Sequence, residues 1–191
     1  MQRLAGARVM QCAPGAFFAA RKSERCALVG GRLPRQRGAR NVAPPMRILL
    51  IQGANMVHLG KREPEFYGTT TAKELDAMLE AHAQSKGYAL EIYYTNVEGE
   101  AINRIYQALK DGVDGIVMNP AGFSHAGYAL RDCIKAAALP YVEVHMTNVA
   151  ARGIDCVLSK VAKGVVYGLG TQSYILGLEA MLHLLKGSKP K

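Results

Sequence analysis

Short apolar segments alternate with longer amphipathic segments along residues 46–191. The apolar segments are four to six residues long, as is typical of buried strands, and they lie at 47–51, 90–95, 115–119, 141–144 and 164–167. The amphipathic segments repeat apolar residues at helical spacing and predict helices at 71–87, 100–110, 126–138 and 174–185. Residues 53–70 are rich in glycine and charge and are predicted to form a loop.

This alternation of strands and helices determines the predicted fold. Parallel strands need long crossover connections, and a helix after each strand supplies them with a right-handed sense. The segment 115–119 is apolar up to its last residue, as expected of a parallel strand covered on both faces. We therefore predict an α/β fold, namely a flavodoxin-like, doubly wound, five-stranded parallel sheet in three α/β/α layers.

The positive charge of the chain is concentrated near its N-terminus. The formal net charge is +9. Residues 1–45 hold nine basic residues against Glu24 alone, a net charge of +8, whereas residues 46–191 hold fifteen basic and fourteen acidic residues, a net charge of +1. Phosphate binding requires a clustered basic surface, so we expect residues 46–191 to bind no nucleic acid and to take a small-molecule substrate.

Residues 1–45 differ from the rest of the chain in pattern as well as charge. They are rich in Arg, Ala, Gly and Pro and show neither strand alternation nor a sustained helical stripe. We interpret them as a basic, disordered extension that precedes a catalytic domain at 46–191. Three origins stay open: an upstream start before a true start at Met46, an organelle targeting segment, or a basic disordered arm.

Neither a membrane span nor a disulfide framework is expected. No apolar run approaches the roughly 20 residues that cross a bilayer. The four cysteines, at positions 12, 26, 133 and 156, form no Cys-x-x-Cys pair. These features favour a cytoplasmic protein without a membrane partner, with organelle targeting by residues 1–45 as the alternative.

A carboxylate and an imidazole lie two residues apart near the end of the fourth strand. Side chains at such spacing point to the same side of a strand, so Glu143 and His145 are expected to be in contact. The carboxylate fixes the imidazole tautomer and favours its protonated form, which makes His145 a candidate proton donor. A buried structural pair is the alternative. A metal site is disfavoured, because His125, His145 and Glu143 lack the spacing of known ligand sets.

An arginine and a tyrosine lie five residues apart in the predicted 53–70 loop. A phenol titrates near pH ~10, so a tyrosine that acts as a base at neutral pH needs a neighbouring cation to stabilise its charge. Arg62 is suited to this role toward Tyr67. A solvated surface pair is the alternative.

Polar groups also follow the third strand. Asn119 ends the strand, Gly122 permits close backbone approach, and His125 precedes the start of a predicted helix. This combination suits an anionic, oxygen-rich ligand, and a plain turn is the alternative. Because the carboxyl ends of parallel strands share one edge of the sheet, we expect these groups and the Glu143/His145 pair to meet in one pocket.

Together these motifs resemble those of type II 3-dehydroquinate dehydratase. The resemblance covers residues 46–191, and the joint match is far more specific than any single motif. The matching stretches are Arg62-Glu63-Pro64 through Tyr67-Gly68, Asn119 with the turn Gly122–His125, Ala129-Leu130-Arg131-Asp132, Glu143-Val144-His145, Ala151-Arg152 and Gly168-Leu169-Gly170-Thr171-Gln172.

The resemblance implies a lyase of the shikimate or quinate pathway that dehydrates 3-dehydroquinate to 3-dehydroshikimate. The reaction would be an anti elimination through an enolate. Tyr67, with Arg62 beside it, would be the base. His145, oriented by Glu143, would be the acid. Gln52 occupies the position of an amide that orients an enolate-stabilising water.

Substrate binding and assembly are implied in the same way. The substrate-binding residues would be Asn119, His125, Asp132, Met146, Thr147 and Arg152. Asn119, the backbone N–H groups of Met146 and Thr147, and the Thr147 hydroxyl would hold the carboxylate. Asp132 would act across a subunit boundary. The family assembles as a homododecamer, a tetramer of trimers, and uses no metal or organic cofactor.

Three positions depart from the family's pattern. Gln52 stands where the family has asparagine, Ala150 where it has histidine, and Cys156 where it has an arginine that contacts ring hydroxyls. Loss of a charged partner weakens recognition by about 1.5–3 kcal/mol. Two alternatives therefore stay open: a related lyase on a different hydroxylated cyclic keto acid, and a weakly active paralogue that binds a metabolite.

Overall fold

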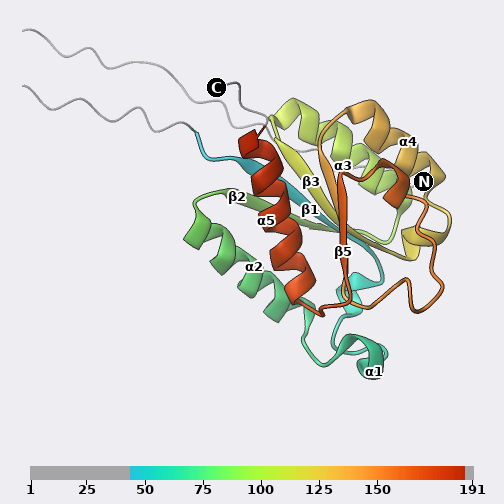
Figure 1. Ribbon diagram of the computed structural model, residues 1–191. Coiled ribbons are helices and arrows are strands. Elements are labelled where there is room, and N and C mark those ends of the chain that lie inside the picture. The colour runs from blue at the N-terminus through green and yellow to red at the C-terminus, as the bar shows by residue number, and fades with distance from the viewer. Residues whose placement is uncertain (1–43, 188–191) are drawn as a thin grey trace, which may run out of the picture. The chain divides into compact units, whose positions relative to one another are not determined.

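The computed structural model describes residues 44–187, which contain a five-stranded sheet (Figure 1). The strands are β1 (Arg47–Ala54), β2 (Ala89–Tyr94), β3 (Gly115–Ala121), β4 (Tyr141–His145) and β5 (Gly164–Tyr167). Their order is β2-β1-β3-β4-β5, and each neighbouring pair is parallel. The predicted doubly wound parallel architecture is confirmed.

Long helices cover both faces of the sheet. They are α2 (Ala72–Lys86), α3 (Glu98–Asp111), α4 (Tyr128–Ala137) and α5 (Gln172–Gly187). Helices α2 and α5 lie on one face, and α3 and α4 on the other, which gives three layers (Figure 1). The shorter helical elements are α1 (Pro64–Tyr67), η1 (Met56–His58), η2 (Gly122–His125) and η3 (Ser159–Val161).

Each face of the sheet has its own hydrophobic core. Alternate residues of a strand point to opposite faces. Leu49 and Ile51 of β1 join the core under α3 and α4, whereas Ile48 and Leu50 join the core under α2 and α5. Burial on both faces explains why this strand is apolar without alternation.

The ends of α2 follow from its local sequence. The N–H of Glu74 donates to Thr71 Oγ1 at 3.3 Å, and the N–H of Thr71 donates to Glu74 Oε2 at 2.8 Å. These reciprocal bonds form the predicted capping box, which is confirmed. Gly87 follows the helix with φ of 72°, a left-handed conformation that glycine adopts without strain.

Two strands are longer than the sequence pattern predicts. The pattern ends the first strand at Gly53, but β1 continues through this glycine to Ala54. Likewise β3 continues through Pro120 to Ala121. A Cβ atom at position 53 would lie 2.1 Å from the carbonyl oxygen of Pro120. The glycine therefore permits close contact between the two strands instead of ending one of them.

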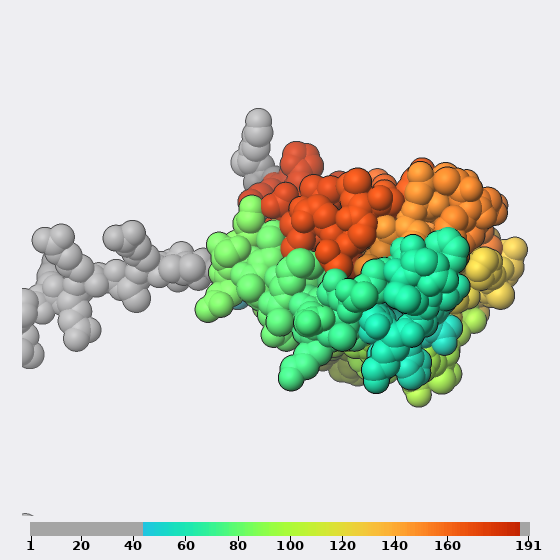
Figure 2. Space-filling model, turned by 90° about the horizontal axis from the view of Figure 1, so that it is seen from below, coloured from blue at the N-terminus to red at the C-terminus, as the bar shows by residue number. Residues whose placement is uncertain are grey.

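The predicted 53–70 loop contains two short helical elements, η1 and α1. Helix α1 has Pro64 at its start, directly after Glu63, which has φ of 40°. Four residues are too few to show a helical repeat, so the pattern predicts only a loop here. Figure 2 shows this segment in teal beside the orange segment that follows β4.

The prediction for residues 1–45 falls, apart from positions 44 and 45, outside the described residues. Within the described range, 44–187, no helix combines the length and the apolar character that crossing a membrane requires.

Candidate active site

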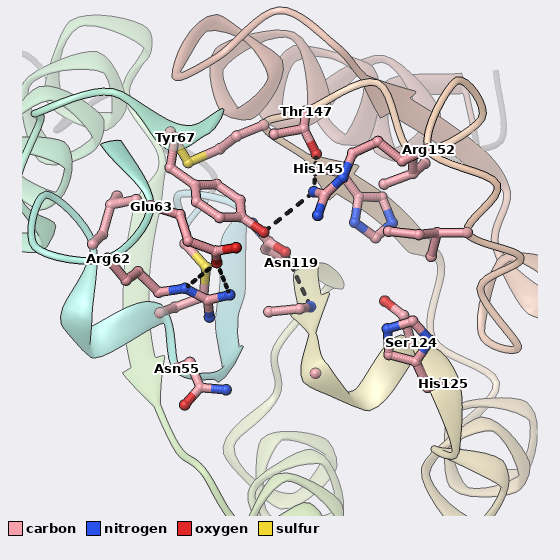
Figure 3. Close-up of a pocket in the computed structure, with 17 residues that line it drawn as sticks. Asn55, Arg62, Glu63, Tyr67, Asn119, Ser124, His125, His145, Thr147 and Arg152 are labelled. Carbon is pink, nitrogen blue, oxygen red and sulfur yellow. Dashed lines mark hydrogen bonds and ion pairs between the residues drawn. The ribbon is translucent and has the colours of Figure 1, made fainter. Parts of the chain in front are cut away.

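A pocket opens at the carboxyl ends of β1, β3 and β4, the edge at which parallel sheets place their ligands (Figure 3). It contains about 780 Å³ of empty space, its open mouth included. Its lining residues are Asn55, Met56, Leu59, Arg62, Glu63, Tyr67, Asn119, Ala121, Gly122, Ser124, His125, His145, Met146, Thr147, Val149, Arg152 and Ile154.

The floor of the pocket contains backbone in unusual conformations. Asn55, directly after β1, has φ of 75°, and Ala121, at the end of β3, has φ of 47°. A left-handed conformation costs a residue such as alanine roughly 1–3 kcal/mol, and such strain gathers at functional sites. The N–H of Ala121 donates to Asn119 Oδ1 at 3.1 Å, which helps to hold the strained turn. This edge of the sheet is therefore marked as a candidate functional site by its backbone alone.

Glu143 and His145, two residues apart on β4, are in direct contact. His145 Nε2 lies 2.8 Å from Glu143 Oε1. The imidazole lines the pocket, and the carboxylate is fully buried behind it. The contact predicted from their spacing is confirmed. Because one ring nitrogen is committed to the carboxylate, the orientation of the ring is fixed.

Three further side chains hold the carboxylate of Glu143. The hydroxyl of Tyr141 donates to Oε2 at 2.9 Å, the thiol of Cys156 donates to Oε2 at 3.4 Å, and the hydroxyl of Ser159 donates to Oε1. Burial alone raises the pKa of Glu143, but hydrogen bonds from His145, Ser159 and Tyr141 outweigh burial and hold that pKa below its ordinary value. The carboxylate is therefore ionised at neutral pH.

Two guanidinium groups flank the ring of Tyr67. The Cζ atom of Arg62 lies 5.0 Å from the ring centroid, and that of Arg152 lies 5.8 Å from it. Arg152 Nη1 also donates to the hydroxyl oxygen of Tyr67 at 3.3 Å. Tyr67 therefore lies between two cationic side chains, of which Arg62 is also paired with Glu63 at 2.8 Å.

Arg152 joins the α1 segment to the loop that follows β4. Its Cζ atom lies 5.1 Å from the centroid of the Phe66 ring, and its Nη1 donates to Thr147 Oγ1 at 3.0 Å. The α1 segment thus borders one side of the pocket, across from Ser124 and His125 of η2 (Figure 3).

Glu143, His145 and Cys156 form a group of three potential metal ligands, whose ligand atoms lie within 4.8 Å of one another. The carboxylate already accepts hydrogen bonds from four side chains. Burial and the neighbouring Glu143 charge raise the pKa of the Cys156 thiol. A metal ion would have to displace several of these bonds and the thiol proton. We therefore interpret the group as a hydrogen-bonded unit.

Comparison with known proteins identifies the family. The family model described as class II dehydroquinase matches residues 46–182. This chain belongs to the class II dehydroquinase family. The sequence-based resemblance is confirmed.

Individual class II dehydroquinases agree with this assignment. The 3-dehydroquinate dehydratase of Thioalkalivibrio sulfidiphilus is 40% identical over 141 residues, covering 72% of this chain and 96% of the relative. The enzyme of the same name from Marinobacter nauticus is 44% identical over 138 residues, covering 71% and 94%. A crystal structure of type II dehydroquinase from Butyrivibrio crossotus matches with a TM-score of 0.70 and 34% identity, covering 72% of this chain and 98% of its own.

In this dehydroquinase pocket the structure brings together most of the predicted site residues. Those that line it are Arg62, Tyr67, Asn119, His125, His145, Met146, Thr147 and Arg152. Glu143 lies directly behind His145. Asp132 is exposed on α4, with its side chain 70% accessible, and is not among the lining residues.

The Gln52 amide is also not among the groups that line the dehydroquinase pocket. Position 52 shares the face of β1 with Ile48 and Leu50, which packs against α2 and α5, and the side chain is fully buried there. The Cys156 thiol is likewise buried against Glu143 and does not line the pocket. Of the three departures from the family's pattern, these two therefore lie behind the pocket wall, and the third, Ala150, is exposed and does not line the pocket.

Several dehydroquinase pocket residues were not predicted from the sequence. Asn55 is the most informative, because it is a polar residue directly after the true end of β1 at Ala54. Val149 and Ile154 add an apolar wall. Nothing in the sequence distinguishes these two from ordinary loop residues, so their place in the pocket emerges only from the structure.

Proposed function

We propose that this protein is a hydro-lyase that converts 3-dehydroquinate to 3-dehydroshikimate, in keeping with the name 3-dehydroquinate dehydratase that its relatives carry. One observation carries the proposal. A phenol and an imidazole line the same pocket, the phenol beside guanidinium groups and the imidazole beside a carboxylate. One group is suited to take a proton and the other to give one, and elimination of water needs both.

Tyr67 is the base in this proposal. Its oxygen, as a phenolate stabilised by Arg62 and Arg152, takes a proton from the carbon next to the substrate ketone. The electron pair of the broken C–H bond then forms an enolate. Removal of a proton by a positioned base typically contributes a rate factor of about 10²–10⁴.

His145 is the acid. Its imidazolium, paired with Glu143, gives a proton to the hydroxyl on the next ring carbon as the C–O bond breaks. Water leaves, the enolate electrons form the C=C bond, and the ketone is restored. Base and acid act from opposite faces of the ring, so the elimination is anti. Exchange with solvent removes the proton from Tyr67 and returns one to His145.

The remaining polar groups bind the substrate in this proposal. The Asn119 amide, the Thr147 hydroxyl and the backbone N–H groups of Met146 and Thr147 hold the carboxylate, a type of group that such donors recognise well. His125 serves the ring hydroxyls. Asp132, exposed on α4, acts across a boundary between subunits of a dodecamer built from trimers.

A second candidate function keeps the same elimination and changes the substrate to another hydroxylated cyclic keto acid. The observation that favours it is the apolar wall of Val149 and Ile154, together with a cysteine at position 156 that does not line the pocket. Such a wall suits a ring with fewer hydroxyl groups on that side.

Conversion of 3-dehydroquinate by the full chain, followed through the absorbance of the enone product, tests the proposal. We expect turnover by the unaltered protein. Tyr67→Phe removes only the hydroxyl and is expected to lower kcat by about 10²–10⁴-fold, because the base is lost.

Tyr106→Phe is the matched control. Tyr106 is also a tyrosine with a partly exposed ring, but it lies on α3 outside the pocket. We expect unchanged activity in this variant. Absence of turnover of 3-dehydroquinate by the unaltered chain would overturn the proposal, and turnover of a less hydroxylated analogue alone would support the second candidate.

A further inference from the structure

Three buried polar side chains meet beneath the pocket. Gln52 of β1 and Asn119 of β3 are register partners on neighbouring strands, and Tyr174 of α5 is bonded to both. Gln52 and Tyr174 are 0% exposed, and Asn119 is 4% exposed. Of the three, only Asn119 lines the pocket (Figure 3).

The hydrogen bonds among them run in one direction. Asn119 Nδ2 donates to the hydroxyl oxygen of Tyr174 at 2.7 Å, and that hydroxyl donates to Gln52 Oε1 at 2.7 Å. A phenol has one proton to donate. Burial raises the pKa of Tyr174, so the proton is retained. Because it is given to Gln52, the oxygen of Tyr174 is left as an acceptor, and it requires a donor from Asn119.

The hydrogen bond to the oxygen of the Asn119 amide requires the same orientation of that amide. The N–H of the strained residue Ala121 donates to Asn119 Oδ1 at 3.1 Å. The amide oxygen is thus directed to Ala121 and the nitrogen to Tyr174. An amide nitrogen carries two hydrogens, and Tyr174 takes one of them. The second remains for an oxygen atom of a ligand.

We propose that Tyr174 and Gln52 are positioning residues that fix the Asn119 amide with its nitrogen available to an oxygen atom of the substrate. This inference rests on the proposed function, because Asn119 acts there on the substrate carboxylate. Gln52 contributes its oxygen. Its Nε2 is buried on the side of Tyr94, and a hydrogen bond from the Gln52 side chain lowers the pKa of that tyrosine against the larger effect of burial, which raises it.

Two substitutions test the proposal in the full chain. Tyr174→Phe removes the hydroxyl and leaves the ring, so Asn119 loses the acceptor that orients it. Gln52→Met keeps the length of the side chain and removes the oxygen, so the Tyr174 proton turns to Asn119 and competes with the N–H of Ala121. For each variant we expect KM for 3-dehydroquinate to rise roughly threefold to tenfold, with kcat changed less than about twofold.

A double-mutant cycle with Asn119→Ala shows whether Tyr174 acts through Asn119. In that background we expect Tyr174→Phe to have no further effect on KM, because the amide that it orients is gone. The matched control is Tyr88→Phe, which removes another buried hydroxyl on the same side of the sheet, bonded to His82 at 3.0 Å. This control is expected to leave KM unchanged, which separates positioning from a general loss of stability.

The outcomes are distinct for the two proposals. Equal effects of Tyr174→Phe with and without the Asn119→Ala substitution would overturn the positioning role while leaving the proposed function intact. If the unaltered chain does not dehydrate 3-dehydroquinate, the same cycle is measured on the Kd of quinate by calorimetry, and a non-additive result there supports positioning on its own. A chain that neither turns over 3-dehydroquinate nor binds quinate would overturn both.

Discussion

The carboxylate of Glu143 is the most constrained charge in the described part of the molecule. It is fully buried, and it accepts hydrogen bonds from His145 and from three other side chains. Its pKa lies below the ordinary value because these bonds outweigh burial. An unfolded chain loses these bonds, so the group links folding to pH.

Because of this link, the free energy of unfolding falls in acid. The unfolded Glu143 carboxyl takes up its proton near its ordinary pKa of 4.5, whereas the folded one does so only at lower pH. Its contribution is therefore present above about pH 4.5 and is lost as the pH falls through the folded value. Between about pH 6 and pH 3.5 we expect the unfolding free energy of Glu143→Gln to decrease less than that of the unaltered protein. Urea denaturation at each pH measures both.

The control for this measurement is Glu65→Gln, which changes an exposed glutamate on α1. We expect its unfolding free energy to follow that of the unaltered protein. Parallel curves for Glu143→Gln and the unaltered protein would contradict the link between this carboxylate and acid stability.

Individual site residues were predictable where spacing alone decides their contact. Glu143 and His145 are two apart on a strand, so their contact follows from strand geometry. The burial of Gln52 was not predicted. The sequence pattern ends the first strand at residue 51, but β1 continues, so Gln52 points to the same face of the sheet as Ile48 and Leu50. The bond from the Cys156 thiol to Glu143 joins residues 13 positions apart in the chain and needed the structure.

The contact of α5 with β4 sets the position of the strand that carries Glu143 and His145. Gly177 of α5 faces Val144, the residue between Glu143 and His145. A Cβ atom at position 177 would lie 2.3 Å from Val144 Cγ1. The helix therefore lies closer to the sheet here than any larger residue would allow.

We expect Gly177→Ala to lower the free energy of unfolding by about 1–3 kcal/mol, because the added methyl group forces helix and strand apart. This loss is the net change, in which the gain of about 1 kcal/mol that alanine brings to a helix interior is already included. Urea denaturation monitored by circular dichroism measures the change. Gly99→Ala in α3 is the control, since a Cβ atom there would meet no other atom within 4 Å, and it is expected to be neutral or slightly stabilising. A stabilised Gly177→Ala variant would contradict the close packing.

Elements with a sustained repeat were predictable, and short ones were not. Helices such as α2 and α3 show several turns of periodicity and end at glycines with left-handed φ, so their C-terminal ends follow from the sequence, although α3 begins at Glu98, two residues before the predicted start. Helix α1 is a single turn, and a single turn gains its stability from contacts such as that between Phe66 and Arg152. These contacts join distant parts of the chain, and no local pattern reports them.

The surface of the molecule carries features that a single copy does not explain. Apolar side chains are exposed on the edge strand β5 and on the turn that follows it. They are Val165, Tyr167 and Leu169. Exposed apolar patches often mark surfaces that associate. Asp132, a predicted substrate-binding residue, lies on α4 with its side chain directed to solvent and outside the pocket of its own chain. Both observations are consistent with association of this chain with further copies of itself, as the proposed assembly requires.

A mixing experiment tests whether Asp132 acts on a neighbouring subunit. We expect Asp132→Ala and Tyr67→Phe each to be inactive or nearly so when prepared alone. Subunits of both kinds that are unfolded and refolded together are expected to regain part of the activity, because some pockets then combine an intact Tyr67 with an intact Asp132 from the other chain. Activity in the 3-dehydroquinate assay, with native mass spectrometry of the assembly, gives the result. No recovery in mixed oligomers would contradict action across a subunit boundary.

The anchoring of Glu143 by several donors has an evolutionary consequence. Tyr141, Cys156 and Ser159 hold one carboxylate beside His145, so the loss of any one of the three leaves the other two in place. One of these anchoring residues can therefore be substituted while the orientation of the His145 imidazole is preserved. A lineage can therefore accumulate substitutions around Glu143 while the contact between Glu143 and His145 is kept at every step.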